Sequence, residues 1–267
     1  LFNNSNYTIS SSETSRSFFA QMNYANVNLQ DSNVRAAIAM AINKKDFTNV
    51  LLKGNGTLAE GPFPKDYTFG DSYVKAAEYN IDNARNLLAQ SGWKDTDGDG
   101  YVDKNGEKLT LRWLTYPSRQ ELPLLAESAQ ATLKDIGMDV DINCTADNNS
   151  VVQDPAAWDV YAMANVQAPT GDPEYWFTVF ATSDATKNQG AYKNEKLDQL
   201  EEQLSQEFDT DKRAKLAVEM QQTVLDDNAF VYCSFLKMSQ ISRANVTGYM
   251  AHACDYYQVT ADLDRKS

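Results

Sequence analysis

The stretch of residues 109–144 constrains the fold more than any other part of the sequence. Apolar and polar residues alternate over residues 109–115 and again over residues 138–144, which is the pattern of β-strands. Between them, residues 119–136 carry an apolar stripe at helical spacing, and Gly137 ends that helix. Such a strand–helix–strand unit normally forms a right-handed crossover between parallel strands. The stretch therefore predicts an α/β fold with parallel strands in its sheet.

The remaining segments fit the same class. Alternating apolar residues predict further strands at residues 17–24, 158–164, 230–236 and 239–246, and we expect the last two to pair with each other. Apolar residues at helical spacing predict further helices at residues 31–42, 45–52, 82–92, 172–180, 197–208 and 209–224. Residues 1–16 are rich in Ser and Asn and predict a flexible N-terminal segment. The predicted architecture is a mixed sheet flanked by helices in one lobe.

An acidic stretch precedes the strand at residue 109 and allows two interpretations. Its aspartates alternate and are followed by Gly100, as at the start of a calcium-binding loop. Position twelve of that motif, normally a bidentate Glu, is Gly106, and a strand follows in place of a helix. The alternative is a tight structural turn, because Asp bonds its own backbone and Gly accepts positive φ. The weak metal candidates are Asp95, Asp97, Asp99 and Asp103.

Composition excludes several classes of function. The chain has 267 residues and a formal net charge of −13, which argues against binding to nucleic acid or to an anionic membrane surface. Its three cysteines show no metal-type pairing, and Cys144 and Cys233 lie in apolar patterns that predict buried thiols. No phosphate-binding glycine motif or other cofactor motif is present, so we predict no cofactor.

Catalysis is also disfavoured by the residues. His252 is the only histidine, so any Ser–His–Asp or Cys–His site would have to use it. Cys254 lies two residues away, but no residue that would orient the imidazole is identifiable. We therefore predict a protein that is not an enzyme.

Four stretches, in this order and spacing, resemble one known family. They are Asp31-Ser32-Asn33-Val34-Arg35-Ala36-Ala37 with Ala41-Ile42-Asn43-Lys44, then Asn80 to Gly100, then Gly171-Asp172-Pro173 with its following aromatics, and last Lys212-Arg213 with the helix to Leu225 and the Phe230 strand. Together they resemble the C-terminal lobe of the peptide/nickel class, family 5, of extracellular solute-binding proteins of ABC transporters. The resemblance covers residues 17–250, and residues 251–267 form a tail without a strong signal.

The resemblance implies one lobe of a type II periplasmic-binding-protein-like fold. It also implies a partner lobe, the N-terminal lobe of the same protein, that closes with this one around a ligand and delivers it to an ABC permease. An oligopeptide is the first choice of ligand, and a nickel chelate is the second. The implied protein is a monomer in the periplasm or outside the cell, held to the membrane by a lipid anchor in a Gram-positive source.

The loop after the predicted strand 158–164 is the expected ligand site, because ligands of open α/β sheets lie at the carboxyl ends of strands. The candidate ligand-binding residues are Asn165, Gln167, Thr170, Asp172 and Tyr175. For Asp172, capping of a helix that begins at Pro173 is the competing role, and for Tyr175 it is packing. Peptide-binding relatives place an acidic residue where this chain has Pro169, which leaves the ligand class open. A calcium-stabilised extracellular interaction module is the third reading.

Overall fold

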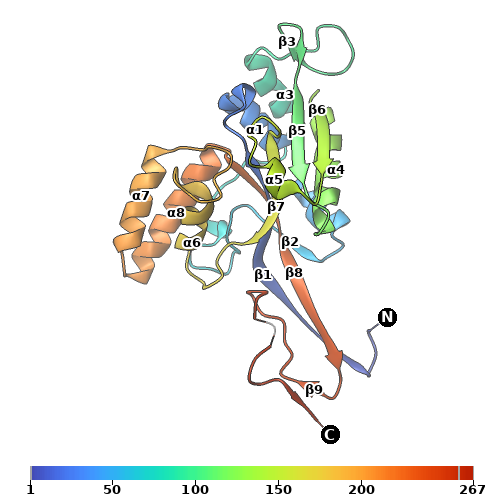
Figure 1. The fold of residues 1–267 in the computed structure, drawn as a ribbon, viewed down its shortest axis with the longest axis vertical. Helices are drawn as coiled ribbons and strands as arrows, with labels where there is room; N and C mark the ends of the chain where they lie inside the picture. Colours follow the sequence, from blue (N-terminus) through green and yellow to red (C-terminus); the bar gives the residue numbers. More distant parts are fainter. Residues whose placement is uncertain (1, 258, 267) are drawn as a thin grey trace.

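A computed structural model describes residues 2–257 and 259–266; Leu1 of the N-terminal segment and Gln258 and Ser267 of the tail lie outside the described residues. The fold is a mixed six-stranded sheet with helices on both faces (Figure 1). The strands follow the order β2-β8-β1-β7-β5-β6, with the bounds β1 Tyr7–Met22, β2 Gly56–Leu58, β5 Thr110–Thr115, β6 Asp139–Cys144, β7 Val160–Val166 and β8 Phe230–Arg243. Two-stranded sheets join β3 Asp103–Lys104 to β4 Glu107–Lys108, and β9 Val246–Thr247 to β10 Asp264–Arg265.

Two apolar cores lie on opposite faces of this sheet. Helices α1 Ser32–Ala41, α3 Ile81–Gln90 and α4 Glu121–Lys134 contribute to one core, and α7 Glu195–Gln206 and α8 Thr210–Asp226 to the other (Figure 1). The short helices are η1 Val27–Gln30, α2 Lys44–Asp46, η2 Phe47–Leu51, η3 Asp71–Tyr73, α5 Asn148–Val151, α6 Glu174–Trp176 and η4 Phe177–Ala181. Among the described residues, no helix combines the length and the apolar content needed to cross a membrane.

The central strands carry apolar side chains on both sides because both of their faces are covered. Adjacent residues of β1 show this alternation: Phe18 packs into the core with α1, and Phe19 into the core with α8. The predicted strand–helix–strand unit is confirmed as β5, α4 and β6, with Leu111 aligned with Val140 in parallel. Trp113 on β5 is fully buried in the core with α1, and a slip of one residue would turn this ring into the opposite core, where the smaller Leu114 packs.

Three details of the sequence interpretation were wrong. Strand β1 begins at Tyr7, so most of the segment expected to be weakly ordered is paired sheet. The segments 230–236 and 239–246 do not pair with each other, because the single strand β8 runs through residues 230–243 and pairs with β1. No Gly, Pro, Asn or Asp separates the two segments, so nothing there favours a turn. Cys144 is exposed because it ends the edge strand β6.

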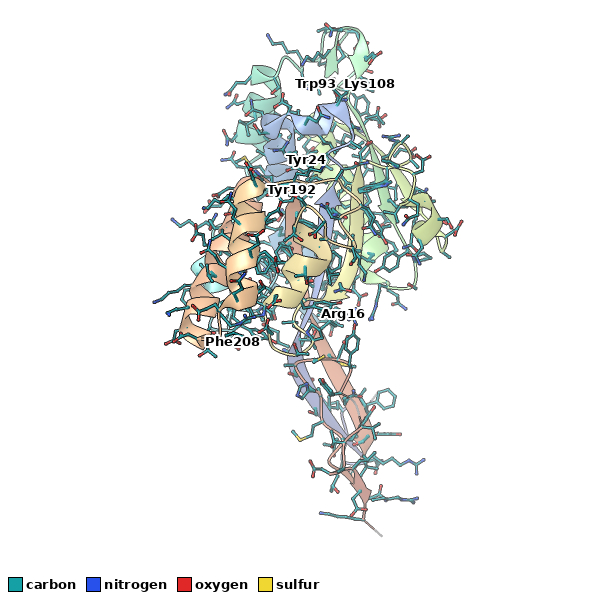
Figure 2. The ribbon with its side chains drawn as sticks, turned by 60° about the vertical axis from the view of Figure 1, so that its left-hand side comes forward. Arg16, Tyr24, Trp93, Lys108, Tyr192 and Phe208 are labelled. Atoms are coloured by element: carbon teal, nitrogen blue, oxygen red, sulfur yellow. The ribbon has the colours of Figure 1, made fainter. Side chains whose placement is uncertain are left out.

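The outer halves of β1 and β8 leave the body as a two-stranded ribbon (Figures 1 and 2). Figure 1 marks both chain ends near the tip of this ribbon. Arg16 lies where this ribbon meets the body (Figure 2). Its buried guanidinium donates to the carboxylate of Asp255 through Nε, at 2.5 Å, and Nη2, at 3.1 Å. The Ser15 N–H donates to the carbonyl oxygen of Ala253 at 2.9 Å. These contacts hold part of the C-terminal tail against the base of the ribbon.

Candidate functional site

A pocket of about 330 Å³ lies beside the carboxyl ends of the parallel strands β5 and β7, and we call it the strand-end pocket. Its polar lining residues are Tyr116, Ser118, Asn148, Asn149, Tyr161, Asn165, Lys187 and Gln189. Apolar side chains of the core beneath α8 form its floor, among them Met163 and Phe180. The base of the ribbon is close, because Asn165 in β7 pairs with Ser17 in β1. The pocket therefore opens at the end of the body from which the ribbon leaves.

Two tyrosines fix the polar wall of the strand-end pocket. The Tyr116 hydroxyl accepts a hydrogen bond from the Ala164 N–H at 3.1 Å, which ties the end of β5 to the end of β7. The Tyr161 hydroxyl accepts from Asn148 Nδ2 at 2.7 Å, so its own hydrogen can be donated to another acceptor. Burial raises the pKa of Tyr161 to about 12 and keeps this phenol protonated at neutral pH. The wall thus offers neutral hydrogen-bonding groups.

Lys187 is the one charged side chain among the described residues that line the strand-end pocket. Its backbone N–H donates to the Val179 carbonyl oxygen at 2.7 Å, and its own carbonyl oxygen accepts from Gln21 Nε2 at 3.4 Å. The ammonium lies 5.3 Å from the centre of the Phe180 ring, in the arrangement of a cation–π contact. Lys187 is exposed, so its ammonium lies at the pocket beside the Phe180 ring and stays accessible to a ligand.

The structure brings only one of the predicted ligand-binding residues into this pocket. Asn165 lines it, and its Nδ2 donates to the Val166 carbonyl oxygen at 2.8 Å. Gln167 was expected to be exposed but is fully buried, since its Nε2 donates to Ser17 Oγ at 2.5 Å. Thr170 is exposed and lies outside the lining. Tyr175 is half-buried and also lies outside it.

Asp172 has a structural partner on another element. Its two carboxylate oxygens each lie 2.9 Å from Nη2 of Arg213 in α8, and this Nη2 also donates to Glu174 Oε2 at 2.9 Å. Asp172 Oδ1 also accepts from the Glu174 N–H at 2.9 Å, at the start of α6. The competing role of helix capping is thereby supported. Trp176, fully buried, packs into the core.

Several lining residues escaped the sequence interpretation. Tyr116 and Ser118 directly follow β5, and the rule of strand carboxyl ends that selected the loop after β7 would have selected them too. Asn148 begins the short helix α5, Lys187 lies in the connection between η4 and α7, and no local pattern marks either residue. Only the packing of these two segments beside the sheet brings them together.

The acidic stretch forms a tight loop between α3 and β3. Asp95, Asp97 and Asp99 each offer a carboxylate oxygen within 4.8 Å of the others, and all three are exposed. Backbone N–H groups of the loop already donate to them, as Gly98 N does to Asp95 Oδ1 at 2.7 Å. Asp103 lies outside that group and accepts from the Thr96 hydroxyl at 2.8 Å. These bonds are the ones that a structural turn requires.

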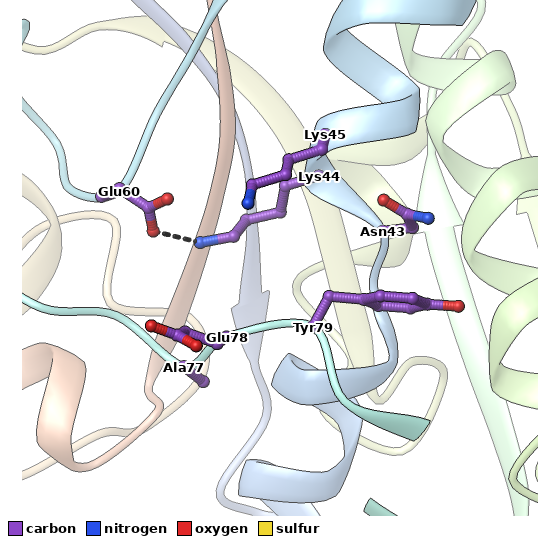
Figure 3. A pocket seen from close by; sticks show the side chains of 7 residues that line it. All are labelled: Asn43, Lys44, Lys45, Glu60, Ala77, Glu78 and Tyr79. Carbon is purple, nitrogen blue, oxygen red and sulfur yellow. Dashed lines mark hydrogen bonds and ion pairs between the residues drawn. The ribbon is translucent and has the colours of Figure 1, made fainter. Parts of the chain in front are cut away.

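A second cavity, of about 260 Å³, lies near the edge of the sheet where β2 pairs with β8 (Figure 3). We call it the sheet-edge pocket. In it, the buried ammonium of Lys44 donates to Glu60 Oε2 at 2.6 Å. Lys45 and Glu78 line the same cavity (Figure 3). Because positive and negative groups alternate here, the cavity presents no net charge of one sign to a ligand.

Comparisons of the sequence with known proteins identify a family. A sequence profile described as bacterial extracellular solute-binding proteins, family 5 Middle, matches residues 1–188. The oligopeptide-binding protein AppA of Bacillus subtilis (strain 168) is 28% identical over 236 residues, which are 86% of this chain and 43% of the relative. The nickel-binding protein NikA of Staphylococcus aureus (strain NCTC 8325 / PS 47) is 27% identical over 215 residues, which are 80% of this chain and 41% of the relative.

Solved structures show the same fold. NikA from Staphylococcus aureus in complex with Ni(L-His)2 gives a TM-score of 0.84 at 23% identity, over 99% of this chain and 54% of that one. AppA from Bacillus subtilis in complex with a nonapeptide gives a TM-score of 0.81 at 25% identity, over 94% of this chain and 51% of that one. The chain therefore spans about half the length of these relatives. The predicted fold class is confirmed, and the chain belongs to the bacterial extracellular solute-binding proteins of family 5.

Proposed function

We propose that this chain is the C-terminal lobe of the solute-binding component of an ABC importer. It captures a small polar ligand, an oligopeptide first, between itself and the N-terminal lobe of the same protein. The observation that carries the proposal is the strand-end pocket, which opens where the ribbon of β1 and β8 leaves the body. Two extended strands form a narrow link, across which a partner lobe can close over the pocket.

The names of similar proteins support a small polar ligand, but they do not distinguish an oligopeptide from a nickel chelate. AppA is named for oligopeptides and NikA for nickel, and both match most of this chain. The strand-end pocket favours the oligopeptide, because its tyrosine, serine and asparagine groups suit amide and carboxylate groups. Family membership also supports an extracellular or periplasmic location and a permease partner. We further propose that the protein is a monomer, that it is no enzyme, and that a lipid anchor holds it in a Gram-positive source.

The second candidate is a nickel chelate, supported by the similarity to NikA. His252, the only histidine, lies on the tail and outside the strand-end pocket. Its Nδ1 accepts from the Cys254 N–H at 3.0 Å, and its ring packs edge-on against Tyr257. Histidine coordination from within this pocket is therefore not supported. A chelate would have to be held through its own ligand groups.

Ligand capture by the full-length protein tests the proposal. The protein is incubated with a random tetrapeptide library or with Ni(L-His)2, passed through a desalting column, and analysed by native mass spectrometry. We expect peptides to be retained, and Ser118→Trp to abolish retention by filling the pocket from an exposed loop position. Thr170→Trp, exposed and outside the lining, is the matched control and should retain peptide. Retention of neither probe by the unmodified protein would refute the proposal.

A further inference from the structure

The charge at the strand-end pocket is positive. Among its described lining residues, Lys187 is the only ionised group, and every other polar group is a neutral hydroxyl or amide. No aspartate or glutamate is part of that lining. The protein as a whole has a net charge of −13, so a pocket that lacks carboxylates and holds a lysine stands out against its surface.

The acidic groups on the neighbouring loop are already engaged. Asp172 and Glu174 share the guanidinium of Arg213, with N–O distances of 2.9 Å to each. Arg213 also donates through Nη1 to the carbonyl oxygens of Leu204 and Glu207, at 2.6 and 2.9 Å. This network ties the loop to α7 and α8. Both carboxylates are paired with a cation and lie outside the lining of the strand-end pocket.

These two observations favour one end of a charged ligand over the other at this pocket. An ammonium group enclosed here would lose its hydration and meet Lys187, a like charge, with no carboxylate to balance it. A carboxylate would receive a charge-assisted hydrogen bond from Lys187. It would also find neutral donors nearby, including the Tyr161 hydroxyl, whose hydrogen is not used by Asn148.

We propose that the strand-end pocket receives an anionic, carboxylate-bearing end of the ligand, with Lys187 as the charge that selects it. The inference rests on the proposed function and adds the charge and orientation of the ligand. The carboxylate can come from the C-terminus of a peptide or from an organic chelator of a metal. The chemistry at Lys187 is the same in both cases, and the two sources are separated by the choice of probe.

The test uses the full-length protein and four probes. They are a random tetrapeptide library of neutral side chains with free ends, the same library amidated at its C-terminus, the same library acetylated at its N-terminus, and nickel citrate. Binding is followed by native mass spectrometry and by titration calorimetry. We expect amidation to weaken binding about tenfold or more, and acetylation to weaken it less, because one charge-assisted hydrogen bond is lost on amidation. Tight binding of nickel citrate in place of peptides would identify the chelator as the source.

A variant pair assigns the effect to Lys187. Lys187→Met should lower affinity for the carboxylate-bearing probe about tenfold and leave the amidated library unchanged. Lys193→Met removes an exposed lysine of the same connection outside the pocket and is the matched control. Circular dichroism and unfolding curves confirm that both variants fold.

The outcomes separate the two proposals. Loss of binding on acetylation without loss on amidation would overturn the inference and leave the transport function intact. A Lys187→Met variant that binds like the unmodified protein would overturn the role of Lys187. Failure of every probe to bind would instead overturn the proposed function, and the inference with it.

Discussion

Asp159, the residue before β7, gives the sharpest stability prediction, because it is a fully buried carboxylate that joins three segments. Its Oδ2 accepts from the backbone N–H of Arg112 in β5 at 2.7 Å and from Arg112 Nε at 2.9 Å. Its Oδ1 accepts from Arg112 Nη2 and from Asn26 Nδ2. The perturbation is Asp159→Asn, which keeps the shape of the side chain and removes its charge.

The size of the loss in the free energy of unfolding depends on which charged partner is left without its counter-charge. Breaking a buried ion pair costs about 3–5 kcal/mol when both partners are enclosed. Here the Arg112 side chain is 39% exposed, so water can solvate its guanidinium after the change. The introduced amide can still accept hydrogen bonds through its oxygen, but its NH2 group replaces the second acceptor and faces donors. We therefore expect a loss of about 2–3 kcal/mol in the free energy of unfolding.

Removing the cation in place of the anion should lower the free energy of unfolding further. Arg112→Met leaves the carboxylate of Asp159 fully buried without its cation, so the loss should reach at least about 3 kcal/mol. Urea unfolding followed by tryptophan fluorescence measures both variants, with the m-value as a check that the denatured state is unchanged. Asp141→Asn on β6 is the matched control, since Asp141 is exposed, and it should stay within about 0.5 kcal/mol. Equal stability of Asp159→Asn and the control would refute this reasoning.

Three further predictions concern the rest of the lobe. Glu60→Gln should lower the free energy of unfolding by about 1–2 kcal/mol in urea, because it leaves the buried Lys44 ammonium unpaired while Glu60 itself is 39% exposed; an unchanged midpoint would contradict this. Native labelling with a thiol reagent should modify the exposed Cys144 alone, increasingly as the pH rises, because desolvation of its sulfur raises the pKa of Cys144 and only the thiolate reacts. Cys233, whose pKa burial raises to about 12, should react only on unfolding, and its labelling in the native protein would contradict the structure. Calcium in place of a chelator should change the melting temperature by no more than about 1 °C, since the 95–103 loop is already satisfied by its own backbone; a larger shift would revive the calcium-stabilised module.

Local patterns in the sequence were sufficient for most secondary structure. The alternation over 109–115 and 138–144 and the apolar stripe between them predicted β5, α4 and β6 and their parallel pairing. Such patterns are reliable because each strand or helix shows its buried face within a few residues. The family resemblance also came from local sequence, from four short stretches in the right order, and the sequence profile confirms it.

Pairing and site composition depended on contacts between distant segments. Residues 230–246 were predicted to form two paired strands, but β1 pairs with residues 230–243 as one strand, β8. Polar residues of the predicted loop were expected at the ligand, yet Gln167 and Asp172 are bound by Ser17 and Arg213 from elsewhere in the chain.

The sequence alone thus determined the fold class and the family, and it predicted a ligand site at the carboxyl ends of the strands. The tertiary structure decided which side chains line the pocket at those strand ends, and it placed Lys187 and Asn148 there from separate parts of the chain. The physical reason is that a buried polar group takes whichever partner the packing brings within hydrogen-bonding distance. That choice depends on the positions of segments far apart in the chain, and no local periodicity records them.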